Sequence, residues 1–105
     1  MRRGDVVELR LPKGVGNEQQ GRRFGVVVQS DALLPRSVVL VAPTSTSARE
    51  ASIRPEIEIF GIRTKVLIEQ ISALDVNRLG EVVTNLYGHD IWAVDDALQL
   101  VLGFH

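Results

Sequence analysis

The feature that most restricts the fold is a series of short apolar stretches rich in β-branched residues. They are Arg23–Ser30 (RFGVVVQS), Ser37–Ala42 (SVVLVA), Glu56–Phe60 (EIEIF) and Thr64–Ile68 (TKVLI). Each has the length of a strand and is bounded by Gly, Pro or polar residues, which is typical of strands joined by turns. A weaker stretch lies at Asp5–Leu11, and a further short strand is expected after Gly80. The chain is therefore predicted to be mainly β.

One of these stretches also predicts a hairpin. EIEIF alternates with a period of two, which places Ile57 and Ile59 on one face of a strand and the glutamates on the other. The residues Phe60-Gly61-Ile62-Arg63 begin at the last residue of this stretch and precede another strand-like stretch. We expect a tight turn there.

The C-terminal part has a different period. From Asp90 to Leu102, apolar residues recur at helical spacing, and Gly103 fits the C-terminal cap of a helix. Strands followed by one closing helix favour a small, strongly bent antiparallel sheet or β-barrel against which the helix packs. We expect a single domain over residues 1–105, of the mainly β class with a C-terminal helix.

The composition excludes several classes of protein. The sequence has no cysteine, so it has neither a disulfide framework nor a thiolate metal site. It is 45% hydrophobic and 24% charged, as in ordinary globular proteins. No apolar stretch reaches membrane-spanning length, and the opening MRRGDVVEL has no apolar signal region. We expect a cytoplasmic protein that makes no contact with a membrane.

The charge is unevenly distributed. The formal net charge is −1, which by itself gives no support for nucleic-acid binding. Six of the twelve Arg and Lys residues, however, lie within residues 1–25, against three acids there. A basic N-terminal quarter of this kind can attract phosphates locally.

Four hydroxyl residues follow one another in the stretch VVLVAPTSTSARE, from Val38 to Glu50. Ser and Thr at the end of a strand usually form turns, because their side chains hydrogen-bond to nearby backbone groups. The same residues could instead form the rim of a binding site. The residues alone leave both interpretations open.

Four motifs occur in a fixed order along nearly the whole chain. They are R-G-D-V at the start, G-x-E-Q…R-R…V-V-x-Q-S-D, E-Q-I…D…R-L, and V-D-x-A-L-x-x-V-L-G at the end. In this order and at this spacing, they resemble the MazF/PemK family of toxins.

The resemblance implies a fold, an activity and partners. The implied fold is a small antiparallel β-barrel that is Src-homology-3-like (PemK/CcdB-like), working as a homodimer. The implied protein is a toxin of a type II toxin–antitoxin system: a sequence-specific endoribonuclease that cleaves single-stranded RNA without a metal or another cofactor. A cognate, MazE-like antitoxin would neutralise it by laying its C-terminal segment across the RNA groove.

Metal-free RNA cleavage sets chemical requirements. The ribose 2′-hydroxyl must lose its proton, the pentavalent phosphorane must be stabilised, and the leaving 5′-oxygen must gain a proton. Histidine pairs usually do this work. Here the histidines are His89 and His105, and we do not expect them to act as a pair. The site must then depend on cations and hydrogen bonds.

Arg23 is the expected catalytic residue, because the resemblance places the family's catalytic arginine at this position. A guanidinium makes planar, bidentate contacts with phosphate oxygens. It is a poor general base, so stabilising charge in the transition state is the expected role. The family commonly has proline after this arginine, whereas this chain has Phe24-Gly25. We expect that difference to change the local backbone and the aim of Arg23.

The resemblance also gives the hydroxyls a role, since a family threonine from a Thr-Ser pair hydrogen-bonds the scissile phosphate. This chain has two such pairs, Thr44-Ser45 and Thr46-Ser47. Counting along the strand from Arg36 favours Thr46, and counting from Pro43 favours Thr44 or Ser45. We predict Thr46 as the catalytic hydroxyl and Thr44, Ser45 and Ser47 as RNA-binding.

Further candidates come from a loop and a later motif. Glu18 is the carboxylate of the Gly-rich loop and is expected to act as a base or to orient Arg23. Asn17 and Gln19 flank it and are expected to bind RNA. Gln70, in E-Q-I, matches a family glutamine that contacts a base, and an amide can pair with base edges in a bidentate manner.

The aromatic residues do not indicate an RNA-stacking surface. Phe24, Phe60 and Tyr87 are too scattered along the sequence to predict one. Trp92 lies in the predicted helix among apolar neighbours, which favours a place in the core or in a dimer interface. Trp92 and Leu98 are apolar helix residues that a twofold partner could cover.

Two other functions remain open. A toxin of the same fold could act without catalysis, by binding and inhibiting a protein such as gyrase. An inert dimeric binding domain is the third possibility, supported by the near-neutral charge. Arg23 beside a Thr/Ser-rich strand end favours the ribonuclease, because an inhibitor has no need of that arrangement.

Overall fold

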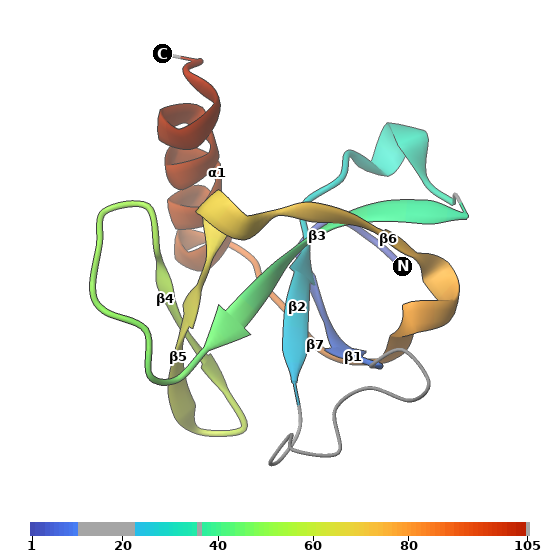
Figure 1. Ribbon diagram of the computed structural model, residues 1–105, viewed down its shortest axis with the longest axis horizontal. Coiled ribbons are helices and arrows are strands. Elements are labelled where there is room, and N and C mark those ends of the chain that lie inside the picture. The colour runs from blue at the N-terminus through green and yellow to red at the C-terminus, as the bar shows by residue number, and fades with distance from the viewer. Residues whose placement is uncertain (11–22, 36, 105) are drawn as a thin grey trace.

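The structure is a computed structural model that describes residues 1–10, 23–35 and 37–104. Its strands are β1 (Asp5–Leu9), β2 (Phe24–Val27), β3 (Val38–Ser45), β4 (Glu56–Ile59), β5 (Ile62–Val66), β6 (Ser72–Asp75) and β7 (Leu79–Asn85). Short 3-10 helices form at η1 (Asp31–Leu33), η2 (Ile68–Gln70) and η3 (Val76–Arg78), and the α-helix α1 spans His89–Leu102. Figure 1 shows the strands curling into an open half-barrel with α1 standing against one side.

The strands form one antiparallel sheet in the order β4-β5-β3-β2-β1-β7, with β6 also paired to β3. The β4–β5 hairpin therefore lies far from β1 in this order, although β3 connects the two parts. The curl of the sheet gives the molecule two apolar sides, an inner one toward α1 and an outer one.

Strand β3 changes partner along its length. On one edge, Val41, Ala42 and Pro43 face β2. On the other edge, residues 38–41 pair with β6, whereas Thr44 and Ser45 pair with β5. Pro43 lies between the two partners and has no N–H to donate. The strand can therefore leave β6 and take up β5 at this position without losing a ladder hydrogen bond from that residue.

Two buried clusters explain the continuous valine runs. Val6, Val26 and Ala42 belong to a cluster that includes Val94 and Ala97 of α1. Val7 and Val27, their neighbours in sequence, belong to a second cluster on the opposite face. Because both faces of β1 and β2 are covered here, the adjacent valines Val6-Val7 and Val26-Val27 are all buried instead of alternating with polar residues.

Helix α1 ends as the sequence predicts. Gly103 has a φ of +81°, and its N–H donates to the Gln99 carbonyl. Gln99 also accepts from the Phe104 N–H, so this end of the helix is satisfied by the backbone. At the other end of the chain, the Arg3 guanidinium donates to Asp95 over 2.5 Å and holds the N-terminal segment against the helix.

The predicted fold class is confirmed: the protein is mainly β, with a curled antiparallel sheet and a C-terminal helix. Three details differ. Strand β3 continues through Pro43 to Ser45, β6 was not predicted, and Gly80 lies inside β7 instead of breaking it. Trp92 is 66% exposed, so its predicted place in the core of the chain is wrong. Leu98 packs against the buried cluster under α1.

Gly25 marks a close approach between β2 and β3. A Cβ atom at this position would lie 2.5 Å from Cγ1 of Val41 and 3.3 Å from the Ala42 carbonyl oxygen. Val41 is buried and β-branched, so it cannot rotate away cheaply.

We therefore expect Gly25→Ala to lower the free energy of unfolding by about 1–3 kcal/mol, as overpacking does in other cores. Chemical denaturation of both proteins measures the change. Gly80→Ala is the matched control, because its Cβ would come no closer than 3.2 Å to Glu8. Equal stability of wild type and Gly25→Ala would contradict the close approach.

Candidate functional site

A cavity of about 700 Å³ opens where four elements meet. These are the start of β2, the end of β3, the tip of the β4–β5 hairpin and η2. Its polar lining consists mainly of predicted site residues: Arg23, Thr44, Ser45, Thr46, Ser47 and Gln70. Its apolar lining includes Phe24, Pro43, Ile59, Phe60, Ile62 and Leu67. Residues separated by almost fifty positions in the sequence thus share one site.

The backbone of Arg23 is held in place just before the start of β2. Its carbonyl accepts a hydrogen bond of 2.8 Å from the Leu9 N–H, which continues the pairing of β1 with β2. The next residue, Phe24, is already in the strand and faces Glu8. The side chain of Arg23 is exposed and lines the cavity. The sheet therefore fixes the backbone from which the Arg23 side chain extends, and the side chain itself is exposed.

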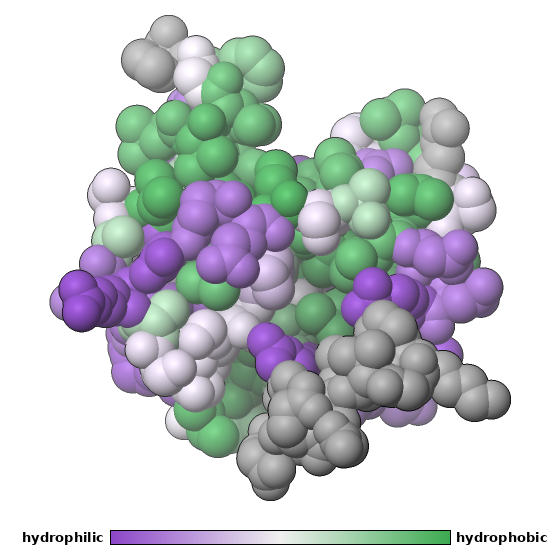
Figure 2. Space-filling view, in the orientation of Figure 1, coloured by the Kyte–Doolittle hydropathy of each residue, from purple (hydrophilic) through white to green (hydrophobic). Residues whose placement is uncertain are grey.

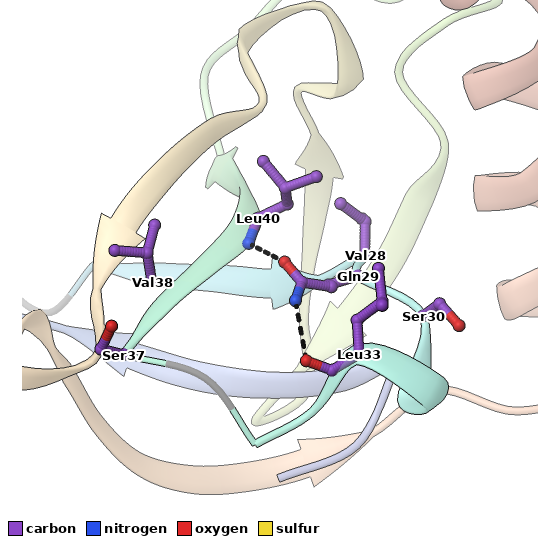
Figure 3. A pocket seen from close by; sticks show the side chains of 7 residues that line it. All are labelled: Val28, Gln29, Ser30, Leu33, Ser37, Val38 and Leu40. Atoms are coloured by element: carbon purple, nitrogen blue, oxygen red, sulfur yellow. Dashed lines mark hydrogen bonds between the residues drawn. The ribbon is translucent and has the colours of Figure 1, made fainter.

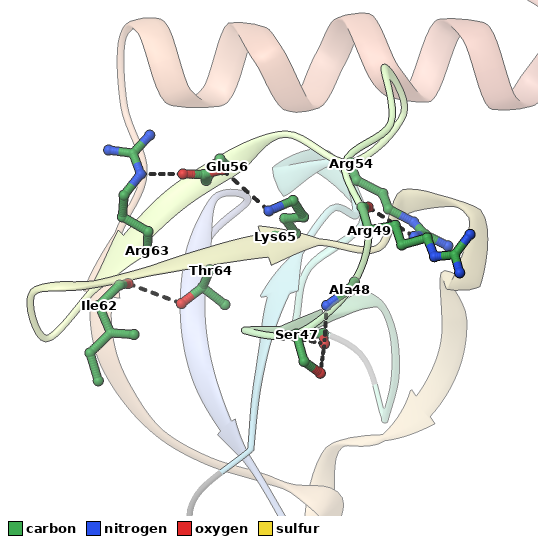
Figure 4. A network of polar contacts seen from close by, with 10 residues as sticks. Ser47, Ala48, Arg49, Arg54, Glu56, Ile62, Arg63, Thr64 and Lys65 are labelled. Carbon is green, nitrogen blue, oxygen red and sulfur yellow. Dashed lines mark hydrogen bonds and ion pairs between the residues drawn. The ribbon is translucent and has the colours of Figure 1, made fainter.

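The first two hydroxyls serve the local structure. Thr44 donates to the Phe24 carbonyl over 3.1 Å. The Ser45 hydroxyl oxygen accepts from the N–H groups of Ser47 and Ala48, over 3.2 and 3.1 Å. Figure 4 shows the Ala48 bond at the turn that follows β3. For Ser45 the turn-forming interpretation of the hydroxyl stretch is therefore correct.

Thr46 and Ser47 differ from the preceding pair. Both are exposed, and both line the cavity. The Ser47 hydroxyl lies 3.4 Å from that of Ser45. Among the residues that the structure describes, none hydrogen-bonds to the Thr46 hydroxyl. Thr46 therefore has its donor and its acceptors available to a ligand in the cavity.

Gln70 reaches the same cavity from η2. Its side chain is exposed, and its backbone N–H donates to the Leu67 carbonyl over 2.9 Å. Leu67 in turn donates to the Pro43 carbonyl, which ties η2 to β3 at the residue just before the hydroxyls. The amide and the hydroxyls are thus held in a fixed relation by backbone bonds.

An ion pair fixes the loop after the hydroxyls to η2. Arg54 donates to one oxygen of Glu69 through Nε and Nη2, over 2.9 and 2.7 Å, and through Nη1 to the Arg49 carbonyl. Figure 4 shows Arg54 reaching across to the Arg49 backbone. The loop that begins at Thr46 is therefore tied to the element that carries Gln70.

Two carboxylates that pair with arginines outside the cavity lining, Glu69 and Glu56, have lowered pKa values. Hydrogen bonds from Arg54 lower the pKa of Glu69 below its usual value, although partial burial opposes this. Hydrogen bonding from Arg63 is the main reason that the pKa of Glu56 is also lowered, with Lys65 adding to it. The lowered pKa of each carboxyl group favours its ionised form, which keeps its ion pair with arginine.

Three predicted site residues, Asn17, Glu18 and Gln19, lie outside the described residues. Their roles stay predictions. In the part of the chain that is described, no three acidic or histidine side chains group together in a way that could hold a metal ion. Nor does any described helix have the length and hydropathy needed to cross a bilayer.

Two of the aromatic residues that are scattered along the sequence come together in space. Phe24 and Phe60 lie together, with ring centroids 5.8 Å apart and an interplanar angle of 70°. Both line the cavity that Arg23 lines. Tyr87 is indeed apart from them, beside a different hollow at the start of α1. The exposed position of Phe60 could have been found from the hairpin prediction, but its nearness to Phe24 depends on how β3 joins β2 to β5.

The fold and the cavity together define a small mainly β protein with a hydroxyl-rich cavity that Arg23 also lines. Residues 2–102 match the family described as PemK-like, MazF-like toxin of type II toxin–antitoxin system. This chain belongs to that family.

Individual proteins support the assignment. A candidate toxin of Mycobacterium tuberculosis is 42% identical over 89 residues, which cover 84% of this chain and 83% of that protein. The endoribonuclease MazF of Staphylococcus saprophyticus is 37% identical over 112 residues, covering 100% of this chain and 93% of that protein.

Solved structures share the fold at lower identity. A mycobacterial endoribonuclease in complex with its cognate antitoxin has a TM-score of 0.80 at 18% identity, covering 100% of this chain and 97% of that one. MazF from Deinococcus radiodurans has a TM-score of 0.78 at 22% identity, covering 99% and 97%. The curled sheet and closing helix are therefore the fold of these proteins.

The ion pair between Arg54 and Glu69 gives a prediction with a defined pH dependence. Because the pKa of Glu69 is lowered in the folded state, the pair contributes fully at neutral pH and is lost as the pH falls through that lowered pKa. We expect Arg54→Met to lower the free energy of unfolding by about 1 kcal/mol at pH 7 and by much less near pH 3. Thermal unfolding at the two pH values measures this.

Arg63→Met is the control, because Arg63 is 74% exposed in its pair with Glu56. It should change the melting temperature little at either pH. A loss for Arg54→Met that is as large at pH 3 as at pH 7 would show that apolar packing of the arginine stem, and not the ion pair, holds the loop.

Proposed function

We propose that this protein is the toxin of a type II toxin–antitoxin system and acts as a sequence-specific, metal-independent endoribonuclease on single-stranded RNA. The observation that carries the proposal is the gathering of Arg23, the Thr44–Ser47 hydroxyls and Gln70 around one cavity. The 37% sequence identity to a protein named endoribonuclease MazF, over 100% of this chain, supports the same reaction. We expect a toxin with this activity to act in the cytoplasm.

The proposed reaction is an attack by the RNA on itself. The 2′-hydroxyl gives its proton to a base and its oxygen bonds to the adjacent phosphorus, the bond from phosphorus to the 5′-oxygen breaks, and the leaving oxygen takes a proton from water. Arg23 contacts the phosphate oxygens and offsets the charge that builds on them. Thr46, which lines the same cavity, donates a hydrogen bond to the same phosphate. The products are a 2′,3′-cyclic phosphate and a 5′-hydroxyl.

The remaining candidates hold and orient the substrate. Gln70 offers an amide to a base edge, and Ser47 adds a hydroxyl at the rim. Glu18, in the loop before Arg23, takes the 2′-proton or orients the guanidinium, and Asn17 and Gln19 contact the RNA beside it. The Thr44 and Ser45 side chains support the rim from behind, in keeping with their hydrogen bonds to the backbone.

We expect the purified protein to cleave a long single-stranded RNA in EDTA, with ends that carry the products named above. Arg23→Ala should reduce the rate on the order of a hundredfold or more, because one preorganised charge donor is lost. Arg49→Ala is the matched control: Arg49 is also an exposed arginine but does not line the cavity. An RNA with a 2′-deoxyribose at the scissile position should resist cutting.

Three results would contradict this proposal. Strict dependence on magnesium would exclude a metal-independent reaction, and cutting of the 2′-deoxy substrate would exclude attack by the 2′-hydroxyl. RNA that stays intact with an otherwise folded protein would favour a toxin that binds a protein target.

The proposal includes a homodimer and an antitoxin. Figure 2 shows apolar side chains gathered over α1 and over the region of η1 and the start of β3. In the second region a hollow of about 490 Å³ is lined by Val28, Gln29, Ser30, Leu33, Ser37, Val38 and Leu40 (Figure 3). The Gln29 amide is occupied there by the Leu33 carbonyl and the Leu40 N–H, which leaves the apolar side chains to face outward.

A twofold copy is the proposed cover for this apolar surface. The cavity that Arg23 lines, in turn, is the proposed binding site for the C-terminal segment of a MazE-like antitoxin. The mycobacterial endoribonuclease of the same fold is known in complex with its cognate antitoxin, which supports an antitoxin as a partner of this protein.

Sedimentation at micromolar concentration should therefore give the mass of a dimer. Leu40→Lys should shift the equilibrium toward monomer, because it places a charge in the apolar hollow. Ile62→Lys is the control, since Ile62 is an exposed residue of the RNA cavity and not of this hollow. A wild-type protein that sediments only as a monomer would contradict the dimer.

A further inference from the structure

The aromatic pair formed by Phe24 and Phe60 has no role in the chemistry proposed above. Phe24 comes from the start of β2 and packs against the main buried cluster. Phe60 comes from the tip of the β4–β5 hairpin and is 63% exposed. Their rings meet edge to face at the wall of the cavity that holds Arg23. A large exposed aromatic side chain thus stands next to the proposed phosphate site.

The backbone at Phe60 is a costly one for this residue. Ile59 and Ile62 pair across a two-residue turn, and its two residues, Phe60 and Gly61, have φ values of +52° and +78°. Turns of this kind favour Asn-Gly or Asp-Gly, because a bulky side chain is strained at positive φ. Among the described residues other than glycine, Phe60 alone has a positive φ. Strain that is kept at a binding site is a sign of function.

The contact with Phe24 gives Phe60 a fixed place. An edge-to-face arrangement is a favourable geometry for two aromatic rings. Phe24 is itself anchored in the sheet, since its backbone pairs with Glu8 and its carbonyl accepts from Thr44. The exposed ring is therefore positioned before any ligand arrives, so little entropy is lost when a flat group stacks on it.

The cavity sets the size of that flat group. Its volume of about 700 Å³ lies within the range of sites that hold small organic molecules. Arg23 and the Thr46 hydroxyl supply contacts for a phosphate, and the Phe24–Phe60 wall supplies an apolar surface beside them. A nucleotide has this combination of an anionic group and a flat, unpaired base.

We infer that Phe60 is a stacking residue for one unpaired base of the RNA, next to the phosphate that Arg23 holds, and that Phe24 positions it. This inference rests on the proposed function. Every base has a π-face, so stacking fixes where the strand lies without selecting a base by itself. The stacked base is thereby presented to hydrogen-bonding groups on the same cavity, of which Gln70 is one.

The test is binding of an RNA that carries a 2′-deoxyribose at the mapped cleavage position, so that it binds without being cut. Phe60→Leu keeps an apolar side chain but removes the ring, and it should weaken binding by about tenfold or more. Phe60→Tyr keeps the ring and should bind within about twofold of wild type. Phe104→Leu makes the same change at a phenylalanine that is 69% exposed outside the cavity, and it should have no effect.

A second series identifies the base. The same oligonucleotide is made with one abasic position at a time around the cleavage site. At the position that stacks on Phe60, losing the base should weaken wild type and Phe60→Tyr but leave Phe60→Leu unchanged. At every other position the losses should add, as they do for independent groups. A general loss of hairpin structure would lower affinity for all oligonucleotides alike and would not give this pattern.

The outcomes distinguish failure of the stacking inference from failure of the ribonuclease proposal. If wild type cleaves and binds RNA, but Phe60→Leu binds as tightly or no abasic position removes the difference, the stacking inference is wrong and the ribonuclease proposal stands. If wild type neither binds nor cleaves RNA, both are wrong. Tenfold weakening that disappears at one abasic position supports the inference.

Discussion

The pairing of strand β3 with three other strands is the constraint on which the rest of the structure depends. Residues 38–41 pair with β6, residues 41–43 pair with β2, and the last two residues, Thr44 and Ser45, pair with β5. Pro43 stands at the change and has no N–H to satisfy. Because of this change the sheet curls, and the β4–β5 hairpin lies beside the start of β2. The cavity exists only where these segments meet.

The candidate site combines groups that hold the structure with groups that are open to a ligand. The hydroxyls of Thr44 and Ser45 hydrogen-bond to backbone groups. The hydroxyl of the next residue, Thr46, stays available to a ligand. The Arg54–Glu69 pair ties the following loop to η2. The rim is therefore held by neighbours of the residues that contact RNA in the proposed mechanism. Such support limits the movement of catalytic groups and so preserves their geometry.

Stability and function conflict at the hairpin tip. The sequence Phe60-Gly61 gives the glycine that the turn needs but puts a bulky ring where asparagine or aspartate would be favoured. Local rules fail in this way mainly at functional or strained sites. At Gly25 the same rules hold, since a residue without Cβ is needed where β2 approaches β3.

The sequence by itself determined the local structure. Periodicity and β-branched runs predicted most strands, the hairpin and a helix ending at Gly103, because these depend on neighbours in the chain. Motif order pointed to the family and to Arg23, Thr46 and Gln70. Only the tertiary structure decided which hydroxyls stay available, that β6 forms, and that Phe24 meets Phe60. Those features depend on contacts between segments distant in sequence, which local patterns do not encode.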